Sequence, residues 1–326
     1  MSPLLITLFL LLSGTDVDDW QWRPGVGFVN TETMERKSPE EFHAYGARLS
    51  TERRTDDALE VMSLLLRNVR DRKVQEEARY LRGKILWSGG RFHDACLALD
   101  DFLRRHPGSA MAEEAKRIEM DSALSLAKKG YAGNFWGSIP LLKWIATSSK
   151  MGLDLLRTTL QRYPREPFSS LYYFKLAEFL FDEKELDAAE QELKFLLSEY
   201  PATADAPRAI LLLGRIGMKK YDSVEYDIHG LKEARRHFER FVEEAPLLSK
   251  ISPEAADFIA GSLPYAKGKI AFIDDKEAEK EFRVGEYYRR KGHFRAARIY
   301  YEWVRKEHAG TTWAAEAGQK LKELFP

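Results

Sequence analysis

The chain has 326 residues, of which 44% are apolar and 31% are charged, enough for one long or two ordinary domains with a substantial core. This composition excludes a wholly disordered chain and a collagen-like one. Lysine plus arginine and aspartate plus glutamate both number 51, so the formal net charge is zero and no overall field attracts nucleic acid or anionic lipid. Any partner must therefore be recognised by a local surface. The single cysteine, Cys96, excludes an intramolecular disulfide framework and a thiolate zinc cluster.

The N-terminus has the layout of a secretory signal. An apolar run from Pro3 to Leu12 is followed by two small residues and then by acidic ones. Because a membrane-spanning helix needs about 20 apolar residues and this run is half as long, residues 1–15 are predicted to be an export signal that is cleaved. The alternative is a frayed apolar terminus. The triplet before Thr15 is similar to the end of a bacterial lipoprotein signal, but Thr15 stands where the lipidated cysteine would be, so no thioether-linked lipid can form.

From residue 40 onward the dominant feature is a repeat. Pairs of small residues stand twelve positions apart, each within two amphipathic segments that a short polar turn separates. Small residues at these places let two antiparallel helices approach closely. The spacing is the tetratricopeptide pattern, and it predicts an all-α tetratricopeptide-repeat solenoid of about five helix-pair units over residues 39–326. The four pairs are Gly46 with Ala58, Gly83 with Ala95, Ala177 with Ala189, and Gly285 with Ala297.

Several segments depart from the regular repeat. Gly214 and Ala234 stand twenty positions apart, so this unit carries an insertion. Helices are predicted at 111–128 and 149–163, and the glycines and proline of the insertion between them, at 130–146, argue against one regular helix. Further segments are an N-terminal arm at 16–38 with no assigned structure, a linking helix or helix pair at 253–277 kinked at Pro264, and a C-terminal capping helix at 312–325.

The insertion at 130–146 is rich in aromatic residues. We expect Phe135, Trp136 and Trp144 to form a hydrophobic docking surface for a partner or for the membrane. The alternative is a loop that folds back on the repeats and covers their apolar edge.

The sequence gives no support for catalysis. The seven histidines include no pair spaced i, i+4, and neither a phosphate-binding GxxxxGK[ST] loop nor a GxSxG motif occurs. Cys96 follows the core residue Ala95 on a repeat helix, where a packed thiol is more probable than a nucleophile. We therefore predict a non-enzymatic protein with no cofactor and no metal. A repeat domain that carries a cryptic hydrolase or metal site stays open as the rival interpretation.

The first helices of the pairs are expected to line a concave surface that binds an extended peptide or a partner helix. Trp87 and Phe181 are the preferred anchors because each stands next to a turn, and aromatic residues near a polar rim often anchor interfaces. The alternative for each aromatic residue is packing against a neighbouring helix. Aligned on the small residues, the candidates are Tyr80, Lys84, Trp87, Phe174, Glu178, Phe181, Leu211, Arg215, Met218, Phe282, Glu286 and Arg289.

The last unit carries the most specific string of the chain. From Val284 to Ala297 it reads Val-Gly-Glu-Tyr-Tyr-Arg-Arg-Lys-Gly-His-Phe-Arg-Ala-Ala. Together with the export signal and the joints that begin with Tyr-Pro or His-Pro, this string resembles the BamD family of outer-membrane assembly lipoproteins, over about residues 40–326. Thr15 and the aromatic insertion depart from that family's pattern.

The resemblance implies an all-α periplasmic subunit of the machinery that inserts β-barrel proteins into the outer membrane. The expected partners are the central barrel subunit, bound by the C-terminal repeats, and unfolded outer-membrane protein segments, bound nearer the N-terminus. Membrane association would then be peripheral and through partners, with no nucleic acid bound. The alternative is another periplasmic repeat scaffold that coordinates cell-envelope or peptidoglycan processes.

Overall fold

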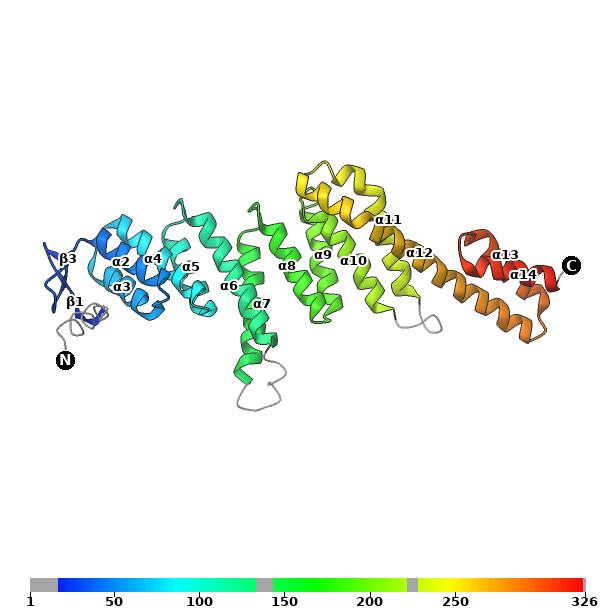
Figure 1. Cartoon of the computed structure of the whole chain (residues 1–326), viewed down its shortest axis with the longest axis horizontal. Coiled ribbons are helices and arrows are strands. Elements are labelled where there is room, and N and C mark those ends of the chain that lie inside the picture. Colours follow the sequence, from blue (N-terminus) through cyan, green and yellow to red (C-terminus); the bar gives the residue numbers. More distant parts are fainter. Residues whose placement is uncertain (1–16, 133–142, 222–227, 325–326) are drawn as a thin grey trace, which may run out of the picture. The chain divides into compact units, whose positions relative to one another are not determined.

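The computed structural model describes residues 17–132, 143–221 and 228–324. In these ranges it contains thirteen α-helices, one short 3-10 helix and one small sheet (Figure 1). The all-α class predicted from the repeat spacing is thereby confirmed. The chain divides into two compact units, residues 1–165 and 166–326. The predicted signal, residues 1–15, lies outside the described residues.

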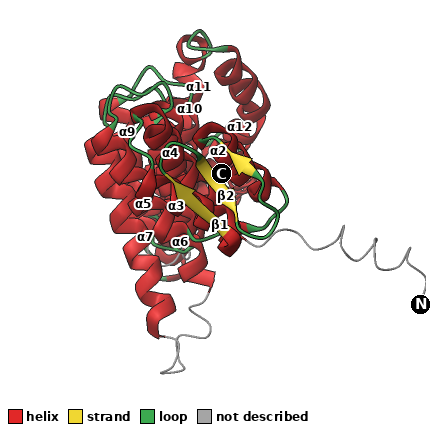
Figure 2. Cartoon of the chain, turned by 90° about the vertical axis from the view of Figure 1, so that its left-hand side faces the viewer, coloured by secondary structure: helices red, strands yellow, loops and turns green. Residues whose placement is uncertain are grey.

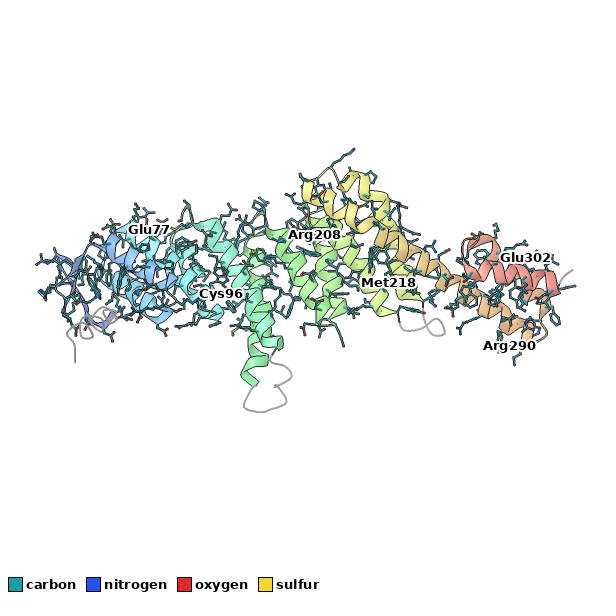
Figure 3. The ribbon with its side chains drawn as sticks, viewed as in Figure 1. Glu77, Cys96, Arg208, Met218, Arg290 and Glu302 are labelled. Carbon is teal, nitrogen blue, oxygen red and sulfur yellow. The ribbon has the colours of Figure 1, made fainter. Side chains whose placement is uncertain are left out.

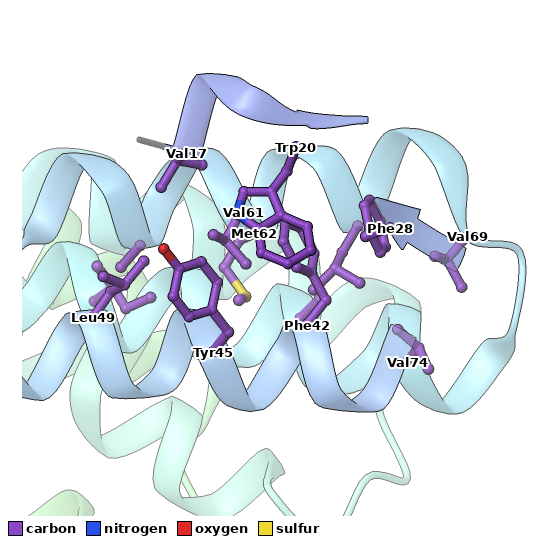
Figure 4. Close-up of a cluster of buried hydrophobic side chains, with 14 residues drawn as sticks. Val17, Trp20, Phe28, Phe42, Tyr45, Leu49, Val61, Met62, Val69 and Val74 are labelled. Carbon is purple, nitrogen blue, oxygen red and sulfur yellow. The ribbon is translucent and has the colours of Figure 1, made fainter. Parts of the chain in front are cut away.

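The N-terminal arm forms a three-stranded antiparallel sheet, which the sequence did not reveal. Strands β1 (Trp20–Arg23), β2 (Gly27–Asn30) and β3 (Arg36–Lys37) follow the 3-10 helix η1 (Val17–Asp19) and pair in chain order (Figure 2). The sheet packs on the first α-helix of the repeats, where the ring of Phe28 stacks on Phe42 with centroids 4.0 Å apart. Figure 4 shows these rings beside Trp20 in one buried cluster. The arm therefore caps the first hairpin of unit 1 and buries its apolar face.

Unit 1 consists of three helical hairpins after this cap. Ser38 begins the first hairpin with a capping box, since its side chain accepts a bond from the Glu41 amide and the Glu41 carboxylate accepts one from the Ser38 amide. The hairpins are α2 (Pro39–Thr51) with α3 (Thr55–Asn68), α4 (Arg72–Ser88) with α5 (Phe92–Arg105), and α6 (Ala112–Ala132) with α7 (Lys143–Arg162).

The small residues of the repeat lie where the helices of a hairpin cross. A Cβ added at Gly83 would stand 2.5 Å from the Leu99 side chain, and one at Gly46 would stand 2.4 Å from Met62. Ala58 and Ala95 are fully buried. Because the helices approach closely at these crossings, the residues there must be small, and this requirement produces the regular spacing in the sequence.

The α6–α7 hairpin is longer than the sequence predicted. Its helices extend to residue 132 and begin again at residue 143, so the segment expected as an irregular insertion is helical at both ends. Phe135 and Trp136 lie outside the described residues, and so does the side chain of Trp144. The docking surface expected there stays a prediction.

Unit 2 contains two regular hairpins, one long helix and a terminal pair. In sequence order these elements are α8 (Ser169–Asp182), α9 (Leu186–Glu199), α10 (Ala206–Lys220), α11 (His229–Leu248), α12 (Pro253–Arg290), α13 (Phe294–Glu307) and α14 (Thr312–Leu324). Helix α14 packs on both α12 and α13, in the place expected for a capping helix.

Helix α12 differs from the expected linking segment because it runs without a break for 38 residues. Pro264 lies inside it, where the missing N–H removes one backbone hydrogen bond without ending the helix. Two separate clusters pack along α12: Phe241 against Phe258 near its start, and Phe282 against Tyr301 near its end. The linker and the first helix of the last hairpin are thus one element.

Candidate functional site

On α4, the residues predicted to line a concave surface contact α5 of the same hairpin and α6 of the next one. Tyr80 is 8% exposed and packs against Phe102, with ring centroids 5.6 Å apart. The Lys84 ammonium pairs with the Glu114 carboxylate of α6 at 2.9 Å. Trp87 is half-buried against the same cluster. Tyr80 is therefore a core residue, and burial with the nearby Glu114 carboxylate raises the pKa of its hydroxyl.

In the first two hairpins of unit 2, one predicted anchor is also buried. Phe181 is 3% exposed, and the Arg215 guanidinium and the Lys219 ammonium each lie 4.8 Å from its ring centroid. The two cations cover the ring instead of leaving it to a partner. Phe174 is half-buried, whereas Glu178 and Arg215 are exposed. The neighbouring candidates Leu211 and Met218 are partly buried and pack against the α10–α12 core.

In the last hairpin, the predicted residues form part of the core and an ion pair. Phe282 is 5% exposed and packs between Tyr301 and Trp313. Glu286 accepts three hydrogen bonds from the Arg289 guanidinium, at 2.8, 3.0 and 3.2 Å, and a fourth from the Tyr301 hydroxyl. Hydrogen bonding to Arg289 lowers the pKa of Glu286. Tyr80, Phe181 and Phe282 therefore correct the expectation of exposed aromatic anchors, because the aromatic positions of the first helices point into the helix stack.

A groove in unit 1 lies on the other side of α4. It has a volume of about 780 Å³, with second helices α3 and α5 as its walls and α4 as its floor. Leu97 of α5 stands in it with 53% of its surface exposed. The lining residues are Asp56, Leu59, Glu60, Ser63 and Leu66 from α3, Arg79, Arg82 and Leu86 from α4, Arg91 from the turn, and Asp94, Leu97, Ala98 and Asp101 from α5.

Ion pairs occupy the two ends of this groove and leave its middle unpaired. Arg91 bonds Asp94 at 2.8 Å at one end, and Arg79 lies 3.4 Å from Asp101 at the other. Between them, Glu60 and Arg82 make no ion pair with any residue that the structure describes. A partner that brings one basic and one acidic side chain beside an apolar stripe would complete this surface.

Unit 2 has an equivalent groove between second helices α9 and α11, with a volume of about 640 Å³. Its lining is polar, and the Lys220 ammonium bridges Asp187 at 2.7 Å and Glu190 at 2.6 Å. Since no leucine lines this groove and its charges are satisfied internally, it offers a partner less apolar area than the unit 1 groove does. The unit 1 groove is the candidate site.

The buried thiol of unit 1, Cys96, does not have the surroundings of a nucleophile. Burial raises the pKa of Cys96 to about 12, so the side chain is a thiol at neutral pH. Figure 3 marks Cys96 in unit 1. Among the described residues, no group of three or more histidine, cysteine, aspartate or glutamate side chains is placed to hold a metal ion. In the same part of the chain, no helix is both long and apolar enough to span a bilayer.

Comparison with known proteins agrees with the hairpin architecture. The tetratricopeptide repeat model matches residues 77–109, which cover most of α4 and all of α5 and so include much of the groove. No curated protein matches the chain.

Solved structures of similar proteins include MamA residues 41 to the end from Desulfovibrio magneticus RS-1, which is 17% identical over 63% of this chain and 93% of that one, with a TM-score of 0.35. A thermophilic tetratricopeptide repeat protein from Thermus thermophilus is 18% identical over 68% of this chain and 98% of that one, with a TM-score of 0.30. A tetratricopeptide repeat protein from Parabacteroides merdae ATCC 43184 is 14% identical over 88% and 98%, with a TM-score of 0.34. The repeat match and the hairpins together show that this chain is an α-helical protein built from tetratricopeptide-type repeats.

Proposed function

We propose that the chain is an exported, non-catalytic adaptor of outer-membrane β-barrel assembly, located in the periplasm. Its repeat architecture supports a scaffold for protein–protein interaction, since stacked helical hairpins present extended surfaces to other chains. The unit 1 groove carries the part of the proposal that concerns binding another protein. The groove is lined by residues of three helices and contains leucines. Two of its charged side chains, Glu60 and Arg82, have no ion pair among the described residues.

The groove suits an amphipathic helix better than a small molecule. The charged residues of its two walls are acidic and those of its floor and turn are basic, and Leu59, Leu66 and Leu97 are spread over two helices instead of converging on one point. A helix that lies between α3 and α5 would pack its apolar stripe on these leucines and place its flanking charges against Glu60 and Arg82. Because the walls are preformed, little ordering entropy of the scaffold opposes binding.

The assignment to barrel assembly rests on the sequence string at 284–297. In the structure this string spans the end of α12, the turn and the start of α13. The string and the export signal together support a subunit of the barrel-assembly machinery, with the central barrel subunit and unfolded outer-membrane protein segments as partners and membrane association through them.

Affinity capture of the full chain from an envelope extract tests this proposal. We expect recovery of the barrel-forming assembly subunit, which the C-terminal repeats would bind, and of outer-membrane protein segments, whose recovery should be reduced by Leu97→Glu in unit 1 and unchanged by Leu247→Glu. Leu247 is the matched control because it is an exposed leucine on α11, outside the groove, with 68% of its surface accessible. Recovery of division or peptidoglycan proteins instead would support the alternative scaffold, and recovery that is equal with both variants would contradict the role of the groove.

A further inference from the structure

The outer face of α13 exposes large apolar side chains between basic ones. Ile299 is 65% exposed and Trp303 is 53% exposed, one helical turn apart. Arg295 and Lys306 lie on the same face, because steps of three and four residues return to one side of a helix. The opposite side, with Tyr301 at its centre, is fully buried against α12 and α14. We call Arg295, Ile299, Trp303 and Lys306 the α13 outer face.

The repeat pattern explains why this face has no cover from its own chain. Ile299 and Trp303 stand two and six residues after the crossing residue Ala297. The residues two and six positions after Ala95 on α5 are Leu97 and Asp101, and both line the unit 1 groove together with residues of α3. The main contacts of α13 are with α12 and α14.

Helices α11 and α13 pack on successive stretches of the long helix α12, and these stretches meet at Asp274. At about 1.5 Å per residue, the 38 residues of α12 span about 57 Å. Helix α11 packs along the first part of α12, from Phe241 against Phe258 to Arg235, which pairs with Asp274 at 3.2 Å and with Glu277 at 2.5 Å. Helix α13 packs along the last part, through Tyr301 and Phe282, and His308 after its end lies 3.0 Å from the same Asp274. Figure 1 shows α13 beside the end of α12 that lies away from α11. Ile299 and Trp303 nevertheless stay 65% and 53% exposed, so no helix that the structure describes covers this face of α13.

The charge around this face is mostly of one sign. Residues 289–307 contain seven basic side chains and two carboxylates, Glu302, which pairs with Arg298 at 2.8 Å, and Glu307, which lies 3.1 Å from Lys306. Figure 3 marks Arg290 and Glu302 on this hairpin. Within residues 289–307, four of the exposed cations have no carboxylate of a described residue within 4 Å: Arg290, Lys291, Arg295 and Arg305.

The turn beside this face adds two more exposed aromatic residues. Tyr287 is 53% exposed near the end of α12, and Phe294 is 51% exposed at the start of α13. Tryptophan, tyrosine and phenylalanine favour the layer between water and acyl chains, where an apolar ring and a polar surrounding are both satisfied. Arginine and lysine beside them bind lipid phosphates.

We infer that the α13 outer face and the turn at 290–295 bind directly to a bilayer surface that contains anionic phospholipid. The contrast with unit 1 favours a bilayer over a protein. The unit 1 groove has walls and charges of both signs, as a folded partner requires, whereas the α13 surface is open and carries a mostly positive charge. This inference goes beyond the proposed function, in which the adaptor reaches the membrane through its partners.

Sedimentation of the full chain with vesicles tests the inference. The vesicles are phosphatidylcholine alone or phosphatidylcholine mixed with phosphatidylglycerol. We expect binding to the mixed vesicles, weakened by salt, and at least about a tenfold loss of partitioning in the double variant Arg290→Gln with Arg295→Gln. The charge-matched control is Arg67→Gln with Arg70→Gln, two exposed arginines of unit 1 without an ion pair among the described residues, which should bind as the unaltered chain does.

A second variant separates lipid insertion from simple charge attraction. Ile299→Ser with Trp303→Ser removes exposed side chains, so its circular dichroism and melting curve should match those of the unaltered chain while vesicle binding falls. Equal binding to neutral and mixed vesicles, or equal binding by both arginine double variants, would overturn the inference. Absent vesicle binding together with tight binding to an acidic polypeptide such as polyglutamate would assign the surface to a protein and would also overturn it.

Discussion

Glu119 of α6 is a buried carboxylate whose ionisation should set the pH dependence of unit 1. It is 3% exposed, and burial raises its pKa from 4.5 to about 7, with a further contribution from the Asp100 carboxylate. The Arg162 guanidinium, 3.6 Å from one carboxylate oxygen, and a hydrogen bond from Thr159 at 3.3 Å oppose this shift only in part. The other carboxylate oxygen has no hydrogen-bond partner.

The sign and size of the effect follow from this raised pKa. The folded state holds the Glu119 proton more tightly than the unfolded chain does, so the stabilisation is present below pH 4.5 and is lost as the pH rises to about 7. A shift of this size corresponds to about 3 kcal/mol, at about 1.4 kcal/mol per pKa unit. Glu119→Gln removes the charge and loses only a screened attraction to the partly exposed Arg162. We therefore expect the variant to be about 2 kcal/mol more stable at pH 8 and about equal at pH 5.

Hydrogen exchange of the full chain at pH 5 and pH 8 measures this difference. After correction for intrinsic exchange rates, the amides of α6 at residues 112–129 should be more protected in the variant at pH 8. Subtracting the two proteins cancels the titration of all other groups. The reasoning is refuted if both proteins show the same change in protection between the two pH values, or if Glu119→Gln is the less stable protein at pH 8.

Three further experiments test packing. Gly152→Ala should lower the free energy of unfolding of unit 1 by about 2 kcal/mol or more, because the added Cβ would stand 2.3 Å from the Ala127 backbone nitrogen. Gly268→Ala on α12, where an added Cβ would have nothing within 4 Å, should raise the free energy of unfolding by about 0.5–1 kcal/mol. Urea titration compares the two variants, and equal effects would contradict the packing. Phe282→Ala should cost about 3–5 kcal/mol and melt the last hairpin, and a melting temperature like that of the unaltered chain would place this ring outside the core. Cys96 should resist maleimide until the chain unfolds, and rapid labelling of the native protein would show an accessible thiol.

The sequence predicted the hairpins because their crossings depend on local residue size. Gly83 and Ala95 had to be small for two helices to touch, and a spacing of twelve records that requirement. The sheet of the N-terminal arm left a weaker signal, since its longest strands have four residues each. The continuity of α12 was hidden by Pro264, because the packing on both sides of this proline outweighs one missing hydrogen bond.

The candidate site was harder to predict than the fold. An aromatic residue on a first helix can face either a groove or the next helix, and the sequence periodicity is the same in both cases. Phe181 and Phe282 face the core. The groove lies between second helices instead, and its clearest signal is Leu97, an apolar residue outside the stripe that faces the hairpin partner. The stacking of neighbouring hairpins decides which side of a hairpin stays uncovered. The sequence of a single repeat does not determine this stacking.

Site-specific crosslinking from the unit 1 groove tests most directly whether this protein acts by holding another chain. A photoreactive amino acid replaces Leu97 in one variant and Leu247 in another, and both are irradiated with the captured partner. We expect an adduct from position 97 that maps to one amphipathic helix of the partner, and none from position 247. Adducts of equal yield from both positions, or none from position 97 while the partner stays bound, would contradict the account.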